Sequence, residues 1–126
     1  MKKLYTPRQF HLYAELYGVN YELLNDRKLI KRLLVNSIKQ ADLKLVKFTD
    51  YHHTALKHSR SVHQGISAIA IIEESHAAIY TWPEHNYCAL DILTCGNPNG
   101  PRKIQKIIEK ALKPKRVDAI YEKKGF

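Results

Sequence analysis

Hydrophobic and polar residues alternate at the start of the chain and then recur with a longer period. Between Gln9 and Tyr17 the even-numbered positions are apolar, which predicts a strand with one buried face. Gly18-Val19-Asn20 predicts a turn, and Asn25 is the expected N-cap of a helix that runs to about Ala41. The apolar residues of this helix recur at spacings of three and four and form one stripe: Leu29, Ile30, Leu33, Leu34 and Ile38.

Apolar segments in the middle of the chain predict more strands. Leu43 to Thr49 is the second expected strand, and the polar segment from Asp50 to Gln64 is expected to be a loop. Gly65 to Glu73 is nearly all Ile and Ala, which indicates a strand buried on both faces, between a helix layer and a partner surface. Two strands joined by a short polar connection are expected at the centre of the sheet: Ala77 to Trp82 and Tyr87 to Cys95.

The end of the chain predicts a second helix and a last strand. The helix begins at Pro101 and ends at Pro114, and the strand runs from Arg116 to Tyr121. This order of elements favours an α+β fold, a two-layer sandwich of a mainly antiparallel sheet with helices packed on one face. Residues 1–126 are expected to form a single domain, because chains divide only beyond roughly 250 residues. A second subunit is expected to cover the other face of the sheet.

Composition narrows the classes of protein. With 44% hydrophobic and 26% charged residues, the chain is neither disordered nor of low complexity. Its longest apolar stretch, Ile66 to Ile72, is far shorter than the ~20 residues of a membrane helix, and no apolar signal core follows the basic start. We therefore expect a cytoplasmic protein without a membrane partner. The net charge of +9 suggests a polyanionic partner such as nucleic acid, and a solvated basic surface is the alternative.

Histidines and lysines are concentrated in two places. Four histidines of the predicted loop lack the helical spacing or cysteine partners of a zinc site, so no metal is expected: His52, His53, His58 and His63. Four lysines share one face of the second helix, as a phosphate-binding stripe would: Lys103, Lys106, Lys110 and Lys113. The solvated side of an amphipathic helix has the same pattern and is favoured, so a nucleic-acid partner is unlikely from sequence.

Thiol chemistry is the other candidate. Cys88 and Cys95 are too few for a disulfide scaffold, and their odd separation places them on opposite faces of one strand. Cys95 ends that strand, and Glu73-Glu74-Ser75-His76 follows the buried strand. A hydroxyl, an imidazole, carboxylates and a thiol are thus concentrated at strand ends, where a merely polar turn is the ordinary alternative.

Short motifs at these positions have the spacing of a known family. The chain closely resembles the prokaryotic S-adenosylmethionine decarboxylases, pyruvoyl enzymes of spermidine biosynthesis, in Glu74-Ser75-His76, Thr81-Trp82-Pro83-Glu84, Tyr87 and Thr94-Cys95-Gly96. The resemblance extends over nearly the whole chain, through His11-Leu12, Glu15, Leu24-Asn25-Asp26, Leu112, Pro114 and Arg116. Because such motifs rarely recur by accident at fixed distances, the resemblance favours an enzyme.

The resemblance implies a proenzyme that cleaves its own chain between Glu74 and Ser75, into a beta chain 1–74 and an alpha chain 75–126. The Ser75 hydroxyl attacks the preceding carbonyl to make an ester, and elimination releases the upstream chain. Ser75 becomes a pyruvoyl group, whose ketone forms a Schiff base with the substrate amine and accepts electrons as CO₂ departs. No metal or dissociable cofactor is expected.

The family's functional positions can be followed onto this chain one at a time. Cys95 matches the proton donor of decarboxylation, a role that suits a thiol near neutral pH. Glu84 matches the carboxylate that contacts the substrate, and Glu15 matches an acidic substrate-binding residue of the first strand. Ser67 matches a serine of the processing machinery. Cys88 has no role in the family and is expected to pack in the core.

One position departs from the family pattern. The family reads I-H-T-W-P-E with the histidine as the base of self-cleavage, whereas this chain has Tyr80 before Thr81. A neutral phenol is a poor base at pH 7. Either a neighbouring group such as His76 takes the proton, or the protein is a homologue that processes slowly or not at all. Retained processing is favoured because the other family residues are present: Ser75, Ser67, Glu84 and Cys95.

The resemblance also implies a substrate and an oligomeric state, and each has an alternative. S-adenosylmethionine is the expected substrate, yielding the decarboxylated aminopropyl donor, and a homodimer with its sites at or near the subunit interface is expected. A paralogous pyruvoyl arginine or ornithine decarboxylase is the alternative, because the segment from Tyr51 onwards is longer than usual and no substrate-stacking ring can be assigned in it. An unprocessed regulatory or nucleic-acid-binding homologue is the alternative from another class.

Overall fold

A computed structural model describes residue 4 and residues 6–54 and 64–125 of the chain. They form a sheet of six strands and a layer of helices. The strands are β1 (Gln9–Tyr17), β2 (Leu45–His53), β3 (Gly65–Ile72), β4 (Ser75–Trp82), β5 (Tyr87–Thr94) and β6 (Arg116–Lys124). The helices are α1 (Tyr21–Leu24), α2 (Arg27–Gln40), the short 3₁₀ turn η1 (Pro83–His85) and α3 (Gly100–Leu112).

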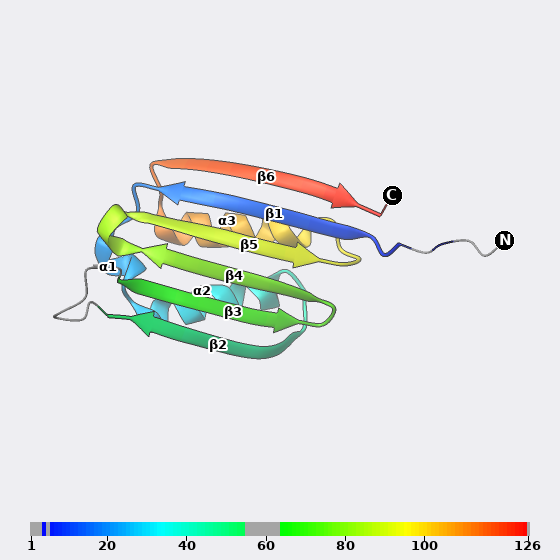
Figure 1. Cartoon of the computed structure of the whole chain (residues 1–126), viewed down its shortest axis with the longest axis horizontal. Coiled ribbons are helices and arrows are strands. Elements are labelled where there is room, and N and C mark those ends of the chain that lie inside the picture. The colour runs from blue at the N-terminus through cyan, green and yellow to red at the C-terminus, as the bar shows by residue number, and fades with distance from the viewer. Residues whose placement is uncertain (1–3, 5, 55–63, 126) are drawn as a thin grey trace.

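The sheet is antiparallel throughout, in the order β2-β3-β4-β5-β1-β6. Strands β4 and β5 are central, and β1 lies between β5 and β6 although β6 ends the chain. Both long helices lie behind the sheet and leave its front uncovered (Figure 1). The predicted α+β sandwich with helices on one face is therefore confirmed.

The core lies between the sheet and the two long helices. Period-two side chains of β1 and β3 meet the apolar stripes of α2 and α3 there, which removes these surfaces from water. The largest fully buried side chains are Leu12, Leu16, Leu24, Ile30, Leu34, Ile38, Ile66, Ile72, Ile79, Leu90, Ile92 and Ile104. None of the helices in the described part of the chain is long and apolar enough to span a membrane.

The boundaries of several elements differ from those predicted. Strand β4 begins at Ser75 instead of Ala77, and β6 continues to Lys124 instead of ending at Tyr121. Asp26, not Asn25, caps α2, because its carboxylate accepts the Leu29 N–H at 3.1 Å. Asn25 instead ends α1, a single turn that the sequence pattern did not predict and that Asn20 caps. The predicted loop from residue 50 was also wrong at its start, because β2 continues to His53; residues 55–63, with His58 and His63, lie outside the described residues.

The front of the sheet, here called the open face, carries the side chains that alternate with the core. On β3, Ile71 is 46% exposed on this face, so the predicted burial of β3 on both faces requires a partner surface. Apolar and aromatic residues with substantial exposure also lie there, including Tyr13 and Tyr51. The open face is therefore the surface that a partner would cover.

Candidate active site

A two-residue turn between β3 and β4 presents the peptide bond between Glu74 and Ser75 at one end of the sheet. Ile72 pairs with Ser75, so Glu73 and Glu74 form the turn. Glu74 has φ +61°, in the left-handed region that costs a residue with a Cβ about 1–2 kcal/mol. The turn is fixed to its surroundings, because the Glu73 N–H donates to the carbonyl of Lys44 at 3.0 Å.

Cys95 contacts both sides of this peptide bond. Its backbone N–H donates to the Ser75 hydroxyl oxygen at 3.1 Å. Its thiol donates to the carbonyl oxygen of Glu74 at 3.3 Å. A donor at that oxygen stabilises the negative charge that develops when a nucleophile attacks the carbonyl carbon. The structure thus brings together three of the residues that the sequence singled out.

The position of Cys95 follows from the end of β5. Strand β5 pairs with β4 up to Leu93 opposite His76, which places the residues after it beside Ser75. Thr94 is fully buried, and its hydroxyl donates to the carbonyl of Asn97 at 3.3 Å, which directs the following turn. Cys95 itself is half-buried. The thiol is therefore held at the turn by a central strand and remains accessible from outside.

A second group of predicted residues forms a row across the open face. Cross-strand pairing places Ser67 of β3 opposite Tyr80 of β4, Tyr80 opposite Ala89 of β5, and Ala89 opposite Glu15 of β1. All four alternate with core residues and so point to the open face. Ser67, Tyr80 and Glu15, which lie far apart in the sequence, therefore share one surface.

This row is distant from the turn within one chain. Ser67 precedes Ile72, the residue opposite Ser75, by five positions along β3. At about 3.3 Å per residue the separation is roughly 17 Å. Glu84 lies still farther away, in η1 beyond the other end of β4. The family resemblance assigns Glu84 and Ser75 to one active site, whereas within one chain the full length of β4 lies between them.

His76 also lies on the open face and has its own partners. Its Nε2 is 3.3 Å from one carboxylate oxygen of Asp91, and the Nε2 of His11 is 2.6 Å from the other. Consecutive strand residues face opposite sides of a sheet, so His76 points away from Ser75 although it follows it directly. Within one chain His76 is therefore directed away from Ser75, and its use as the base of self-cleavage stays a prediction.

Sequence reasoning missed His53 because it assigned residues 50–64 to a loop. His53 ends β2, points to the open face, and its Nε2 lies 3.1 Å from the Ser67 hydroxyl oxygen. The ring of Tyr51 meets the imidazole edge-on, with ring centroids 4.6 Å apart. A signal was present, because Thr49, Tyr51 and His53 continue the alternation of the strand that precedes them.

Aromatic residues form a second row beside Ser67, Tyr80 and Glu15. The rings of Trp82 and Tyr17 each lie 5.3 Å from the ring of Tyr87, centroid to centroid. The Tyr87 hydroxyl donates to the Glu15 carboxylate at 2.7 Å. Burial, and then this bond to Glu15, raise the pKa of the Tyr87 phenol. With His85, the three rings line an open cavity of about 330 Å³, a surface suited to stacking a flat ring or receiving a cation.

Cys88 lies on the helix side of β5 and is fully buried, as predicted. Burial raises the pKa of its thiol to about 12. A buried thiol with so high a pKa is almost entirely protonated at neutral pH and reacts slowly. The two cysteines are thus separated into a core residue and a site residue.

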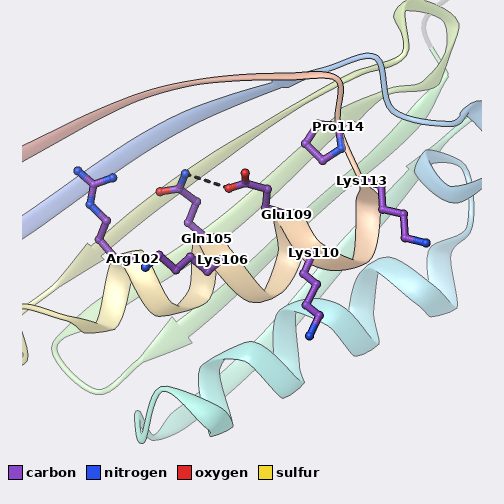
Figure 2. Close-up of a pocket in the computed structure, with 7 residues that line it drawn as sticks. All are labelled: Arg102, Gln105, Lys106, Glu109, Lys110, Lys113 and Pro114. Carbon is purple, nitrogen blue, oxygen red and sulfur yellow. Dashed lines mark hydrogen bonds between the residues drawn. The ribbon is translucent and has the colours of Figure 1, made fainter.

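The lysine-rich face of α3 forms the other candidate site. Lys106, Lys110 and Lys113 line a hollow of about 390 Å³ with Arg102, whereas Lys103 is not part of its lining (Figure 2). Gln105 and Glu109 also line it, and the Gln105 amide donates to the Glu109 carboxylate at 3.4 Å. A carboxylate within the hollow opposes a polyanion, so this surface is a weaker candidate than the turn. Within the described residues, no group of three or more potential ligands could hold a metal ion.

Comparisons with known proteins agree on one family. The sequence pattern of the S-adenosylmethionine decarboxylase family matches residues 10–125. The chain is 37% identical over 115 residues to the S-adenosylmethionine decarboxylase proenzyme of Sulfurihydrogenibium sp. (strain YO3AOP1), covering 91% of this chain and 80% of that protein. It is 36% identical over 115 residues, with the same coverage, to the proenzyme of that name from Persephonella marina.

A solved structure has the same fold. The crystal structure of the adenosylmethionine decarboxylase from Aquifex aeolicus VF5 superposes with a TM-score of 0.82. The match covers 96% of this chain and 93% of that one, at 27% sequence identity. The similarity in fold therefore extends over nearly the whole chain.

Proposed function

The chain belongs to the S-adenosylmethionine decarboxylase family, and from this premise we propose that it is a self-cleaving proenzyme that decarboxylates S-adenosylmethionine for spermidine biosynthesis. One observation carries the proposal. Cys95 donates through its N–H to the Ser75 hydroxyl and through its thiol to the Glu74 carbonyl. These contacts lie on the nucleophile and the electrophile that cleavage before Ser75 requires.

The geometry favours attack of Ser75 on the Glu74 carbonyl. The thiol of Cys95 polarises that carbonyl, and its N–H orients the attacking oxygen. The left-handed φ of Glu74 raises the energy of the intact turn, and breaking the peptide bond relieves the strain. The product of attack is an ester between the Glu74 carbonyl carbon and the Ser75 oxygen.

Loss of the upstream chain converts Ser75 into the pyruvoyl group, which supplies an electron sink for decarboxylation. Ser75 is half-buried at the start of a central strand, so the group would be fixed in direction and partly shielded from water. Cleavage also breaks the covalent link between Ser75 and the Glu74 carbonyl, the group to which the Cys95 thiol donates in the intact chain. The thiol then faces the reacting position, where it donates the proton that replaces CO₂.

The active form is a homodimer with its sites at the interface of the two subunits. Ser67 and Tyr80 are roughly 17 Å from Ser75 along the strands of one chain, so they cannot act on their own cleavage site. A second copy packed on the open face would bring its row of residues toward that site. Glu84 and Glu15 then contact the substrate from the partner's side, and the aromatic row receives the adenine or the sulfonium. The cytoplasmic location stays a prediction.

Mass spectrometry under denaturing conditions tests the cleavage. The native chain is expected to give fragments of 74 and 52 residues (126 − 74 = 52), with a pyruvoyl group on the second. The Ser75→Ala variant is the control and is expected to stay intact, because it lacks the nucleophile. An intact 14.6 kDa native chain after prolonged incubation would contradict the proposal.

Release of CO₂ identifies the substrate. Cleaved protein offered S-adenosylmethionine, arginine or ornithine is expected to release CO₂ from S-adenosylmethionine alone. Release from arginine or ornithine in its place would assign the chain to a paralogous activity.

A further inference from the structure

We propose that His53 supplies the imidazole for self-cleavage that the family pattern places at position 80, where this chain has a tyrosine. The inference rests on the proposed function and names a residue of the same site. It assigns to His53 the proton transfer that follows formation of the ester.

The contacts of His53 fit this role. Its Nε2 lies 3.1 Å from the Ser67 hydroxyl oxygen, so the imidazole and the hydroxyl form a hydrogen-bonded pair on the open face. Tyr51 packs edge-on against the ring and limits its rotation. Gly65 pairs directly with His53 at the end of β2. His53 is half-buried, so part of its side chain stays accessible on the open face.

Ser67 connects His53 to the position that the family uses. Tyr80 pairs with Ser67 from the β4 side, and His53 reaches the same serine from the β2 side. The strands on either side of β3 therefore place a tyrosine opposite Ser67 and an imidazole within hydrogen-bond distance of its hydroxyl. An imidazole is a general base suited to neutral pH, whereas a neutral phenol is a poor one.

The other histidines on described parts of the open face are arranged differently. His76 and His11 are both hydrogen-bonded to Asp91, in rows nearer the turn of their own chain. His52, the sequence neighbour of His53, points to the opposite face and bonds Asn25 at 2.9 Å. His53 is the one that shares a hydroxyl with the row of Ser67 and Tyr80.

The step that needs a base is the elimination. The Nε2 of the partner copy's imidazole takes the proton from the Cα of Ser75 in the ester. The electron pair of that C–H bond forms the Cα=Cβ double bond, and the bond from Cβ to the ester oxygen breaks. The upstream chain leaves as a carboxylate, and His53 releases its proton to water. Water then hydrolyses the dehydroalanine that remains, releasing ammonia and leaving the pyruvoyl group.

Replacement of His53 tests the inference by the stage at which cleavage stops. His53→Gln keeps a hydrogen-bonding group beside Ser67 but removes the base, so we expect cleavage to slow by about 10²-fold or more. Because the ester still forms, hydroxylamine added to this variant should cleave it and leave an unmodified Ser75 on the 52-residue fragment. Intact mass under denaturing conditions measures both results, and His52→Gln is the matched control that should cleave like the native chain.

A second change separates the base from a structural role. Adding Tyr80→His to His53→Gln restores the family's histidine and should restore cleavage, which repair of a packing defect would not explain. If His53→Gln failed to fold, as judged by circular dichroism, Ser67→Ala should give the same ester, because it removes the hydroxyl that holds the imidazole.

The outcomes distinguish this inference from the proposed function. If the native chain and the His53→Gln chain both cleaved, and at equal rates, the role of His53 would be overturned. The proposed function would still stand. The same holds if the slow variant accumulated no ester, or if the double variant stayed as slow as His53→Gln. A native chain that never cleaves would overturn both.

Discussion

Cys95 and Cys88 show how position in the fold gives one residue type two different fates. The Cys88 thiol is in the core, where burial raises its pKa to about 12. Cys95 is half-buried at a turn and donates to the carbonyl before Ser75. The two cysteines are seven residues apart, and an odd separation along a strand directs side chains to opposite faces of the sheet. Position alone therefore makes one thiol a core residue and the other a site residue.

This difference predicts selective modification of the cleaved protein. Iodoacetamide at neutral pH is expected to modify Cys95 and to leave Cys88 unmodified, because the buried thiol is protonated and enclosed. Peptide mass mapping identifies the modified residue, and release of CO₂ should be lost in parallel. The Cys88→Ser variant is the control, since its loss of activity on modification should match that of the native protein. Full activity after complete modification of Cys95 would contradict its role as proton donor.

At the scale of elements, an ion pair connects β2, an edge strand of the sheet, to the start of α2. Arg27, the first residue of α2, donates two hydrogen bonds to the carboxylate of Asp50 on β2, at 2.8 and 2.9 Å. The hydrogen bond from Arg27 lowers the pKa of Asp50. Because β2 ends with Tyr51, His52 and His53, this ion pair fixes the strand that carries the histidine assigned above.

The Arg27–Asp50 pair should make stability depend on pH in a definite direction. A folded-state pKa below the unfolded one stabilises the fold above the ordinary value near 3.9, and this stabilisation is lost as the pH falls through the folded value. Asp50→Asn should therefore lower the free energy of unfolding by about 1 kcal/mol at pH 7, since charged hydrogen bonds are lost at a partly exposed site. Urea unfolding in a Ser75→Ala background, which keeps the chain intact, measures the difference.

The same experiment contains its control. As the pH falls through the folded-state pKa of Asp50, the difference between Asp50→Asn and the parent should shrink, because the parent carboxyl becomes protonated as well. Asp118→Asn removes an exposed pair with Arg116 and should change stability little at either pH. A difference for Asp50→Asn that persisted unchanged at low pH would show that charge pairing is not its cause.

At the scale of the whole molecule, the two halves of the candidate site lie at different ends of one sheet. The turn with Ser75 and Cys95 is at one end, and the row of Ser67 and Tyr80 is nearer the other. Strands of this length are stiff enough that no local movement closes a gap of roughly 17 Å. A second copy with its open face on the first is the arrangement that would complete both sites at once.

Complementation between two inactive chains tests this arrangement. A Ser67→Ala chain keeps the cleavage site, and a Ser75→Ala chain keeps Ser67 and His53. When the two are coexpressed, mixed dimers should cleave the Ser67→Ala chain, although each chain expressed alone stays largely intact. Mass spectrometry identifies the cleaved chain by its residue at position 67.

The control for complementation is a Ser75→Ala chain that also carries Ser67→Ala, which should rescue nothing. Two results would contradict the dimer: failure of the mixed chains to cleave, or gel filtration that shows the native chain as a monomer at micromolar concentration.

The sequence by itself determined the elements and the reactive motif. Alternation from Gln9 to Tyr17 predicted β1 to the residue, and the apolar spacing after Asp26 predicted α2 apart from its cap. These patterns are local, because the period of a strand or helix is visible in neighbouring residues. The pairing of Glu74-Ser75 with Cys95 was foreseeable as well, since both segments lie at the ends of predicted neighbouring strands. Where the alternation continued into a polar segment, as at His53, composition concealed the strand.

Only the tertiary structure decided which of these residues meet. The row of Ser67, Tyr80 and Glu15 depends on cross-strand register, and register is set by the packing of every core side chain at once. The same register separates Glu84 from Ser75 and places His53 beside Ser67. Contacts between residues so far apart along the chain leave no periodic signal in one sequence, because they arise from the folding of the whole sheet.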